Sequence, residues 1–178
     1  NAISALVANQ ANREANRMLA CVSDFLRATL AHDGRHEHTL AEELALLDAY
    51  LEIEKARLGE RLRLTMKAGP DLLDSAVPYL MLQPLVENAV KHGIGQMIAP
   101  GCVRVSATRA GSLLRIVVDN DVDPDTPCVR GTGLGLENVR RRLAAAYGIE
   151  ASVHWGVEAS RFRVELALPA EAVDTVED

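Results

Sequence analysis

The sequence predicts an α+β fold, in which an N-terminal helical hairpin precedes an α/β sandwich with a mixed sheet. Apolar residues recur every three or four positions through the first third of the chain, as in amphipathic helices. Further on, short stretches of alternating apolar and polar residues mark strands, with helical segments between them. With 178 residues and 48% apolar types, the chain can bury a substantial core.

Composition excludes several classes of protein. Lys and Arg number 19 against 25 Asp and Glu, and this net charge of −6 argues against nucleic-acid binding. No apolar run approaches the roughly 18 residues of a bilayer-spanning helix, so we expect no membrane contact. The cysteines, Cys21, Cys102 and Cys128, are too scattered for a disulfide framework or a zinc site. We expect reduced thiols and a cytoplasmic location.

The first 58 residues are expected to form a helical hairpin. A stripe of apolar residues from Ile3 to Leu30 predicts the first helix, and the polar residues around Gly34 predict a turn. Thr39 lies three residues before Glu42, the spacing of a capping box, and predicts a second helix up to Leu58. Two hairpins could pair as a four-helix bundle in a homodimer, or both helices could pack on the rest of this chain.

Residues 59–170 are expected to form one domain, and 171–178 an acidic tail. We expect a mixed sheet with helices on one face. The predicted elements are a strand at Arg61–Met66, a helix at Pro78–His92, a hairpin of Val103–Thr108 with Leu113–Val118, a loop at Asp119–Gly133, a helix at Leu134–Tyr147, and a hairpin of Ala151–Trp155 with Phe162–Leu168.

A polar cluster ends the helix predicted at Pro78–His92. Asn88, Lys91 and His92 stand at i, i+3 and i+4, so an α-helix places them on one face, and Glu87 precedes them. An amide oxygen, an ammonium group and an imidazole suit a phosphate chain with bound Mg²⁺, which prefers oxygen ligands. The alternative is a solvated helix end whose cations stabilise the C-terminus.

A second cluster, at residues 131–135, consists of glycines at the start of a helix. The residues are Gly131, Thr132, Gly133, Leu134 and Gly135. Glycines let backbone amides approach phosphate closely, and a helix N-terminus favours an anion. The stretch lacks the Lys-Ser/Thr end of a P-loop, and an acidic loop replaces the buried strand of a dinucleotide fingerprint.

Asp119 follows the strand predicted at Leu113–Val118. A carboxylate there can accept a hydrogen bond from an exocyclic amine such as that of adenine, although an acid at a strand end is more often an ordinary turn residue.

Three stretches resemble motifs of the sensor histidine kinases of the LytS/YehU and AlgZ/FimS type. Leu-Gln-Pro-Leu-Val-Glu-Asn-Ala-Val-Lys-His-Gly at 82–93 resembles their N box. Gly-Thr-Gly-Leu-Gly-Leu-Glu-Asn-Val-Arg-Arg-Arg-Leu at 131–143 resembles their second glycine box, and Tyr-Leu-Glu-Ile-Glu-Lys-Ala-Arg-Leu at 50–58 resembles a linker helix. The resemblance implies the Bergerat ATP-binding fold of the GHKL proteins.

The resemblance also implies roles for single residues. Asn88 would bind Mg²⁺, Lys91 and His92 would face the phosphates of ATP, and Asp119 would accept from the adenine amine. Gly131, Gly133 and Gly135 would let a lid close over the triphosphate. Ser160 stands where the family often has a Thr near adenine.

The sequence departs from the family pattern in two places. Asp121 and Asp123 replace the glycines of the first glycine box, which puts negative charge near the expected nucleotide. The family's phosphoaccepting His stands in a stretch expected upstream of residue 1, and the parent protein is expected to be membrane-anchored by other segments.

The implied function is transfer of the ATP γ-phosphate to a protein histidine, for relay to a response regulator. Pro84 occupies the position where hydrolytic relatives carry a general-base Glu, so transfer is favoured over hydrolysis. Glu87 could orient or deprotonate the incoming imidazole, or only hold Lys91. The alternatives are a nucleotide- or regulator-binding module without turnover, and a GHKL ATPase.

Overall fold

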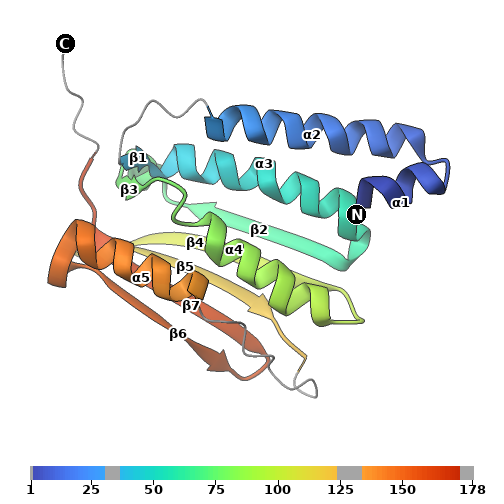
Figure 1. Ribbon diagram of the computed structural model, residues 1–178. Helices are drawn as coiled ribbons and strands as arrows, with labels where there is room; N and C mark the ends of the chain where they lie inside the picture. Colours follow the sequence, from blue (N-terminus) through green and yellow to red (C-terminus); the bar gives the residue numbers. More distant parts are fainter. Residues whose placement is uncertain (1, 31–36, 124–133, 173–178) are drawn as a thin grey trace, which may run out of the picture.

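The computed structural model describes residues 2–30, 37–123 and 134–172. Its helices and strands form an α-helical hairpin beside a sheet that carries helices on one face (Figure 1). The helices are α1 (Ala2–Ala8), α2 (Asn12–Leu30), α3 (Leu40–Leu58), α4 (Gln83–Asn88) and α5 (Leu134–Tyr147). The strands are β1 (Glu37–Thr39), β2 (Leu62–Ala68), β3 (Ala76–Pro78), β4 (Gly101–Ala110), β5 (Leu113–Asp121), β6 (Ser152–Glu158) and β7 (Arg161–Pro169).

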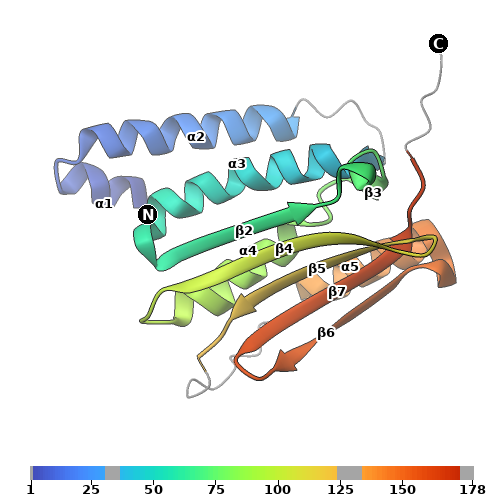
Figure 2. The same ribbon diagram turned by 180° about the vertical axis from the view of Figure 1, so that it is seen from behind.

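The five-stranded sheet has the order β2-β4-β5-β7-β6. β2 and β4 are parallel and the other neighbours are antiparallel, so the sheet is mixed, as the sequence predicted. β1 and β3, which the sequence pattern does not predict, pair in a separate two-stranded ribbon. Seen from behind, the strands lie in front of α4 and α5 (Figure 2). We call the face toward these helices the inner face and the opposite one the outer face.

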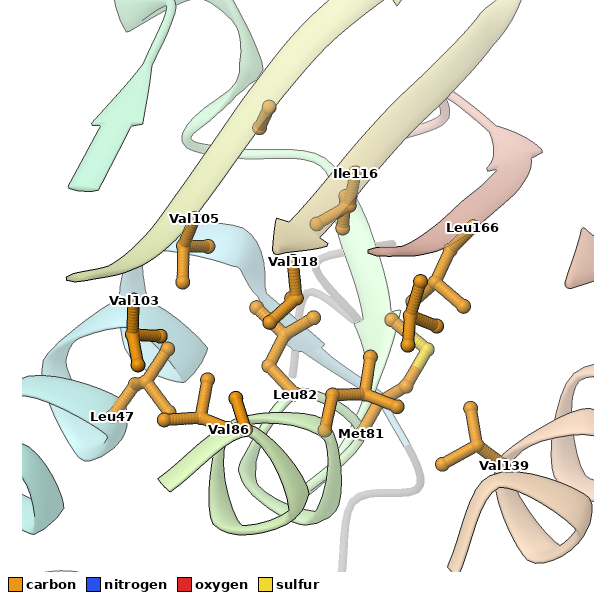
Figure 3. Packing of buried hydrophobic residues seen from close by; sticks show 14 of the residues in the cluster. Leu47, Met81, Leu82, Val86, Val103, Val105, Ile116, Val118, Val139 and Leu166 are labelled. Carbon is orange, nitrogen blue, oxygen red and sulfur yellow. The ribbon is translucent and has the colours of Figure 1, made fainter. Parts of the chain in front are cut away.

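The core fills the space between the inner face and the helices. Figure 3 shows Ile116 and Val118 pointing from β5 toward Leu82 and Val86, with Val139 of α5 beside them. Because side chains alternate along a strand, the even-numbered residues of β5 face inward and the odd-numbered ones outward.

The predicted first helix is interrupted. The sequence predicted one helix from Ile3 to Leu30, but α1 ends at Ala8 and α2 begins at Asn12. Gln10 between them has φ 60°, a left-handed conformation that an α-helix does not contain. Few apolar residues in this stretch face a partner, so packing does not hold a continuous helix together.

α3 begins at the predicted capping box. The Glu42 N–H donates to Thr39 Oγ1 at 3.1 Å, and the Thr39 N–H donates to Glu42 Oε2 at 2.8 Å. α3 lies between α2 and the rest of the fold (Figures 1 and 2), and it buries Leu40, Leu47 and Leu51. Of the two arrangements left open, α3 thus packs on the rest of this chain, whereas α2 packs mainly on α3 and leaves apolar side chains exposed.

The helix predicted from Pro78 starts later. Pro78 ends β3, residues 79–82 form a turn, and α4 begins at Gln83. Leu80 in this turn has φ 52°, and a residue in that conformation cannot continue a helix. After Asn88 the helix widens into a π-turn over Ala89–Gly93. Such turns are rare and often mark functional sites.

Candidate functional site

The helical segment of α4 and its π-turn carries the first predicted cluster along the inner face. Leu85, Val86 and Val90 are buried, Asn88 is half-buried, and Lys91 and His92 are exposed. The buried side of the segment therefore anchors it on the sheet, while its polar residues stay accessible.

Glu87 is held by two neighbours on the same segment. Lys91 Nζ donates to Glu87 Oε2 at 2.9 Å, and Gln83 Nε2 donates to Glu87 Oε1 at 2.9 Å. Burial alone would raise the pKa of Glu87, but these hydrogen bonds from Lys91 and Gln83 hold it below its ordinary value. Both carboxylate oxygens are thus engaged, which favours the reading of Glu87 as the residue that orients Lys91.

The segment meets the sheet where Gly93 faces Asn120. A Cβ on Gly93 would lie 2.0 Å from Asn120 Nδ2, so only glycine permits this approach. Asn120 is 2% exposed and stands opposite Val103 on β4 and Phe162 on β7. Its Nδ2 donates to the Asp121 carbonyl at 2.9 Å, which leaves the carboxamide oxygen as a hydrogen-bond acceptor.

Asp119 lies on the other side of the sheet. Its neighbour Val118 points into the core (Figure 3), so alternation turns Asp119 to the outer face. There Asp119 Oδ1 accepts from Arg104 Nη1 at 3.0 Å, and the residue is only 7% exposed. The resemblance implied that Asp119 would lie in one site with Asn88, Lys91 and His92. The structure does not bring these residues together.

Asp121 also turns outward. β5 continues through Asp121, beyond the predicted end at Val118. Asp121 accepts hydrogen bonds from Arg104 Nη1 and from the Cys102 N–H, both at 2.9 Å, and lies 3.8 Å from Arg161 Nε. Burial opposes ionisation, but these partners lower the pKa of Asp121 below its ordinary value. Its charge is therefore compensated on the outer face.

The second glycine cluster lies partly outside the described residues, which exclude Gly131, Thr132 and Gly133. Leu134 and Gly135 are the first residues of α5, and a Cβ on Gly135 would meet no atom within 4 Å among the described residues outside its own helix and chain neighbours. α5 therefore begins at the predicted residue.

Ser160 lies in the turn between β6 and β7, where its carbonyl accepts from the Val122 N–H at 3.0 Å. It lines an open hollow of about 640 Å³ together with Met97, Asp121, Val122, Glu158, Ala159, Arg161 and Arg163. Asn88, Lys91 and His92 do not line this hollow, so the structure does not join Ser160 to the first cluster there.

Sequence reasoning missed three residues at or near this site. Asn120 lies two residues after Val118, but Val117 is apolar as well, so alternation in the sequence alone does not show which face Asn120 takes. Glu43 could have been found because it interrupts the buried stripe of α3 with an acid. Arg142, whose guanidinium donates to the Tyr79 and Leu80 carbonyls, gave no signal beyond being one of three successive arginines.

In the ranges described, no three His, Cys, Asp or Glu side chains gather as a metal site. Nor is any helix in those ranges long and apolar enough to cross a bilayer. A Mg²⁺ bound chiefly by phosphate and water needs only one protein oxygen, and the half-buried Asn88 amide is of the right type.

Comparisons with known proteins agree with this fold. Residues 1–62 match the histidine kinase family. Sensor histidine kinase BtsS of Escherichia coli K12 is 32% identical over 170 residues, covering 95% of this chain and 30% of the relative. Sensor histidine kinase/phosphatase LytS of Staphylococcus aureus Mu50 is 30% identical over 188 residues, covering 96% and 31%. The chain thus spans just under a third of these relatives.

Solved structures share the architecture at low sequence identity. Acinetobacter baumannii histidine kinase AdeS is 13% identical with a TM-score of 0.57, covering 93% of this chain and 85% of that one. The histidine kinase domain of Erythrobacter litoralis EL346 is 17% identical with a TM-score of 0.56, covering 92% and 83%. The fold is therefore that of histidine kinase ATPase domains, and over 95% of its length the chain is similar to a sensor histidine kinase.

Proposed function

We propose that this chain is the ATP-binding catalytic part of a two-component sensor histidine kinase. It would transfer the γ-phosphate of ATP to a protein histidine, for relay to a response regulator. The observation that carries the proposal is the meeting of Gly93 and Asn120. It places a buried hydrogen-bond acceptor at the end of the segment that bears Asn88, Lys91 and His92.

In this proposal Asn120, and not Asp119 as the resemblance implied, binds the adenine amine. Its carboxamide oxygen would accept a hydrogen bond from the adenine amine, since its nitrogen is already engaged. Phe162 stands opposite Asn120 on β7, and Val157 stands opposite Phe162 on β6, so both share the inner face with it. These apolar side chains would form a floor for the base.

The phosphates would lie toward the π-turn. Lys91 and His92 are exposed there and could neutralise the phosphate charge, and Asn88 would supply an oxygen to Mg²⁺. When bound, Mg²⁺ would neutralise negative charge on the transferring phosphoryl group. Glu87 would act by holding Lys91 in place through the ion pair at 2.9 Å.

Transfer to a histidine is favoured over hydrolysis. Pro84 stands one helical turn before Asn88 and offers no carboxylate to activate water, and Glu87 has both oxygens engaged. The outward direction of Asp121 also supports turnover over a binding module without it. Its charge is paired with Arg104 on the face opposite the proposed nucleotide.

A homodimer formed through the N-terminal helices would cover apolar side chains that the single chain leaves exposed. α2 leaves Leu19, Leu26 and Leu30 exposed, the last at 81%. A second hairpin packed against them would bury these side chains in a four-helix bundle. Light scattering of the purified chain, with a dimer as the expected mass, tests this part of the proposal.

Titration with ATP in the presence and absence of Mg²⁺ tests the site. Asn88→Ala should weaken Mg²⁺-dependent ATP binding by about tenfold and leave Mg²⁺-free binding nearly unchanged, because only a cation contact is lost. Asn16→Ala on α2 is the matched control. Equal weakening with and without Mg²⁺ would assign Asn88 a structural role, and a wild-type chain that binds no ATP would overturn the proposed function.

A further inference from the structure

The turn at residues 79–82, directly before α4, is held in an unusual conformation. Leu80 has φ 52°, in the left-handed region that glycine adopts easily and that costs other residues free energy. A non-glycine residue stays in this region only where surrounding contacts fix it. The contacts of this turn therefore indicate what determines where α4 begins.

Glu43 of α3 supplies the first set of contacts. Its carboxylate accepts the N–H of Met81 at 3.0 Å and of Leu82 at 3.2 Å, and also the N–H of Leu80. The side chain is buried, and the residue is 2% exposed. Hydrogen bonds to a buried carboxylate are among the stronger ones in proteins, so Glu43 joins α3 firmly to the start of α4.

Arg142 of α5 supplies the second set. Its guanidinium donates to the Leu80 carbonyl at 3.3 Å and to the Tyr79 carbonyl. The Tyr79 hydroxyl in turn donates to the Thr29 carbonyl of α2 at 2.7 Å. One four-residue turn thus contacts α2, α3 and α5, and Leu80 is held at both its N–H and its carbonyl.

We propose that Glu43 and Arg142 are positioning residues for the nucleotide site. They fix the start of α4, and through this helix they fix Asn88 and the π-turn against the inner face. Because Glu43 belongs to the helical hairpin, a movement of α3 displaces the segment that would face the phosphates. This inference rests on the proposed function. We call Glu43, residues 79–82 and Arg142 the α4 joint.

If the α4 joint acts as proposed, its variants should give a result that a general loss of stability would not produce. Glu43 and Arg142 act on the same residue, Leu80, so removing either contact releases the same turn. The two losses should therefore not add, whereas changes at unconnected sites add within error. A double-mutant cycle on ATP affinity, measured where every variant is folded, separates the two cases.

The test compares Glu43→Gln, Arg142→Lys and the double variant with the controls Glu52→Gln and Arg141→Lys. Glu52 on α3 pairs with Lys55 and lies 4.0 Å from Arg17, and Arg141 on α5 pairs with Glu137, so the ion pairs of both controls lie away from the turn. Glu43→Gln and Arg142→Lys should each lower ATP affinity about tenfold. The double variant should lower it by much less than the roughly hundredfold loss that two additive effects would give. The controls should stay within about twofold of wild type.

Hydrogen exchange of the same proteins gives a second readout. ATP should slow exchange of the Met81 and Leu82 amides in the wild type and the controls, and this effect should be reduced in Glu43→Gln. Should Glu43→Gln not fold, Arg142→Lys at its exposed position carries the test alone.

The outcomes separate the inference from the function on which it rests. If the wild type binds ATP and folded joint variants bind it equally well, the inference is wrong and the proposed function stands. Additive losses in the cycle would also overturn the α4 joint. A wild type that binds no ATP would instead overturn the proposed function.

Discussion

Asp119 and Asn120 are neighbours in the chain, yet they lie on opposite faces of the sheet. Asp119 is on the outer face with its charge paired to Arg104, whereas Asn120 is on the inner face against Gly93. Both are almost completely buried. The comparison shows that an acid at a strand end is not by itself a ligand-binding group, because the face on which it lies decides what it can reach.

The two faces also differ in the charged side chains that they carry. On the outer face Arg104 bonds both Asp119 and Asp121, and Arg115 bonds Glu165 across two strands. On the inner face the end of β5 carries no acid, only an amide whose oxygen can accept. We infer that the outer face stabilises the sheet and that the inner face is the one able to receive a nucleotide.

Among the changes that test this difference between the faces, we expect Gly93→Ala to have the largest effect on stability and on ATP binding. The new Cβ would collide with Asn120, so the helical segment and the end of β5 must separate. We expect a loss of about 1–3 kcal/mol in the free energy of unfolding, together with loss of ATP binding. Chemical denaturation and ATP titration measure the two effects.

Gly156→Ala is the matched control for that substitution, because a Cβ there would meet nothing within 4 Å. If Gly93→Ala binds ATP like Gly156→Ala, the contact between Gly93 and Asn120 does not form part of the site.

A smaller effect is expected from Asp121 and from pH. Its folded-state pKa is lowered, since hydrogen bonds from Arg104 and the Cys102 N–H outweigh the cost of burial. A lowered carboxyl pKa contributes stability above the unfolded-state value of 3.8, and this contribution is lost as pH falls through the folded-state pKa. Asp121→Asn should therefore reduce how steeply the stability of the fold decreases as the pH falls into the acid range.

Thermal unfolding between pH 2 and 6 measures that decrease in stability, while ATP affinity at neutral pH should stay near wild type. A strong loss of ATP affinity in Asp121→Asn would place this outer-face carboxylate in the nucleotide site and contradict the assignment of faces.

Much of the fold could be predicted from local pattern. The capping box at Thr39, the two strand hairpins and the start of α5 at Leu134 depend on neighbours in sequence, and the structure confirms them. The late start of α4 could not be predicted, because it depends on Glu43, a residue about 40 positions away that binds the backbone of the preceding turn. The break near Gln10 likewise depends on missing tertiary contacts.

The placement of the candidate site residues could be predicted in part, and their roles stay predictions. The N-box segment lies on the helix-bearing face, but the strand residue that meets it is Asn120 and not Asp119. Motif position suggested the acid, whereas the period of two along β5 decides the face. A shift of one residue is invisible to motif matching, and only the placement of Val118 in the core resolves it.

The most direct test of the account compares ATP affinity in Asn120→Ala and Asp119→Asn. Thermal unfolding first establishes that both variants are folded. We predict that Asn120→Ala weakens ATP binding at least tenfold, since the acceptor for the adenine amine is lost, and that Asp119→Asn stays within about twofold of wild type. The reverse pattern, with loss in Asp119→Asn and none in Asn120→Ala, would contradict a nucleotide site on the inner face.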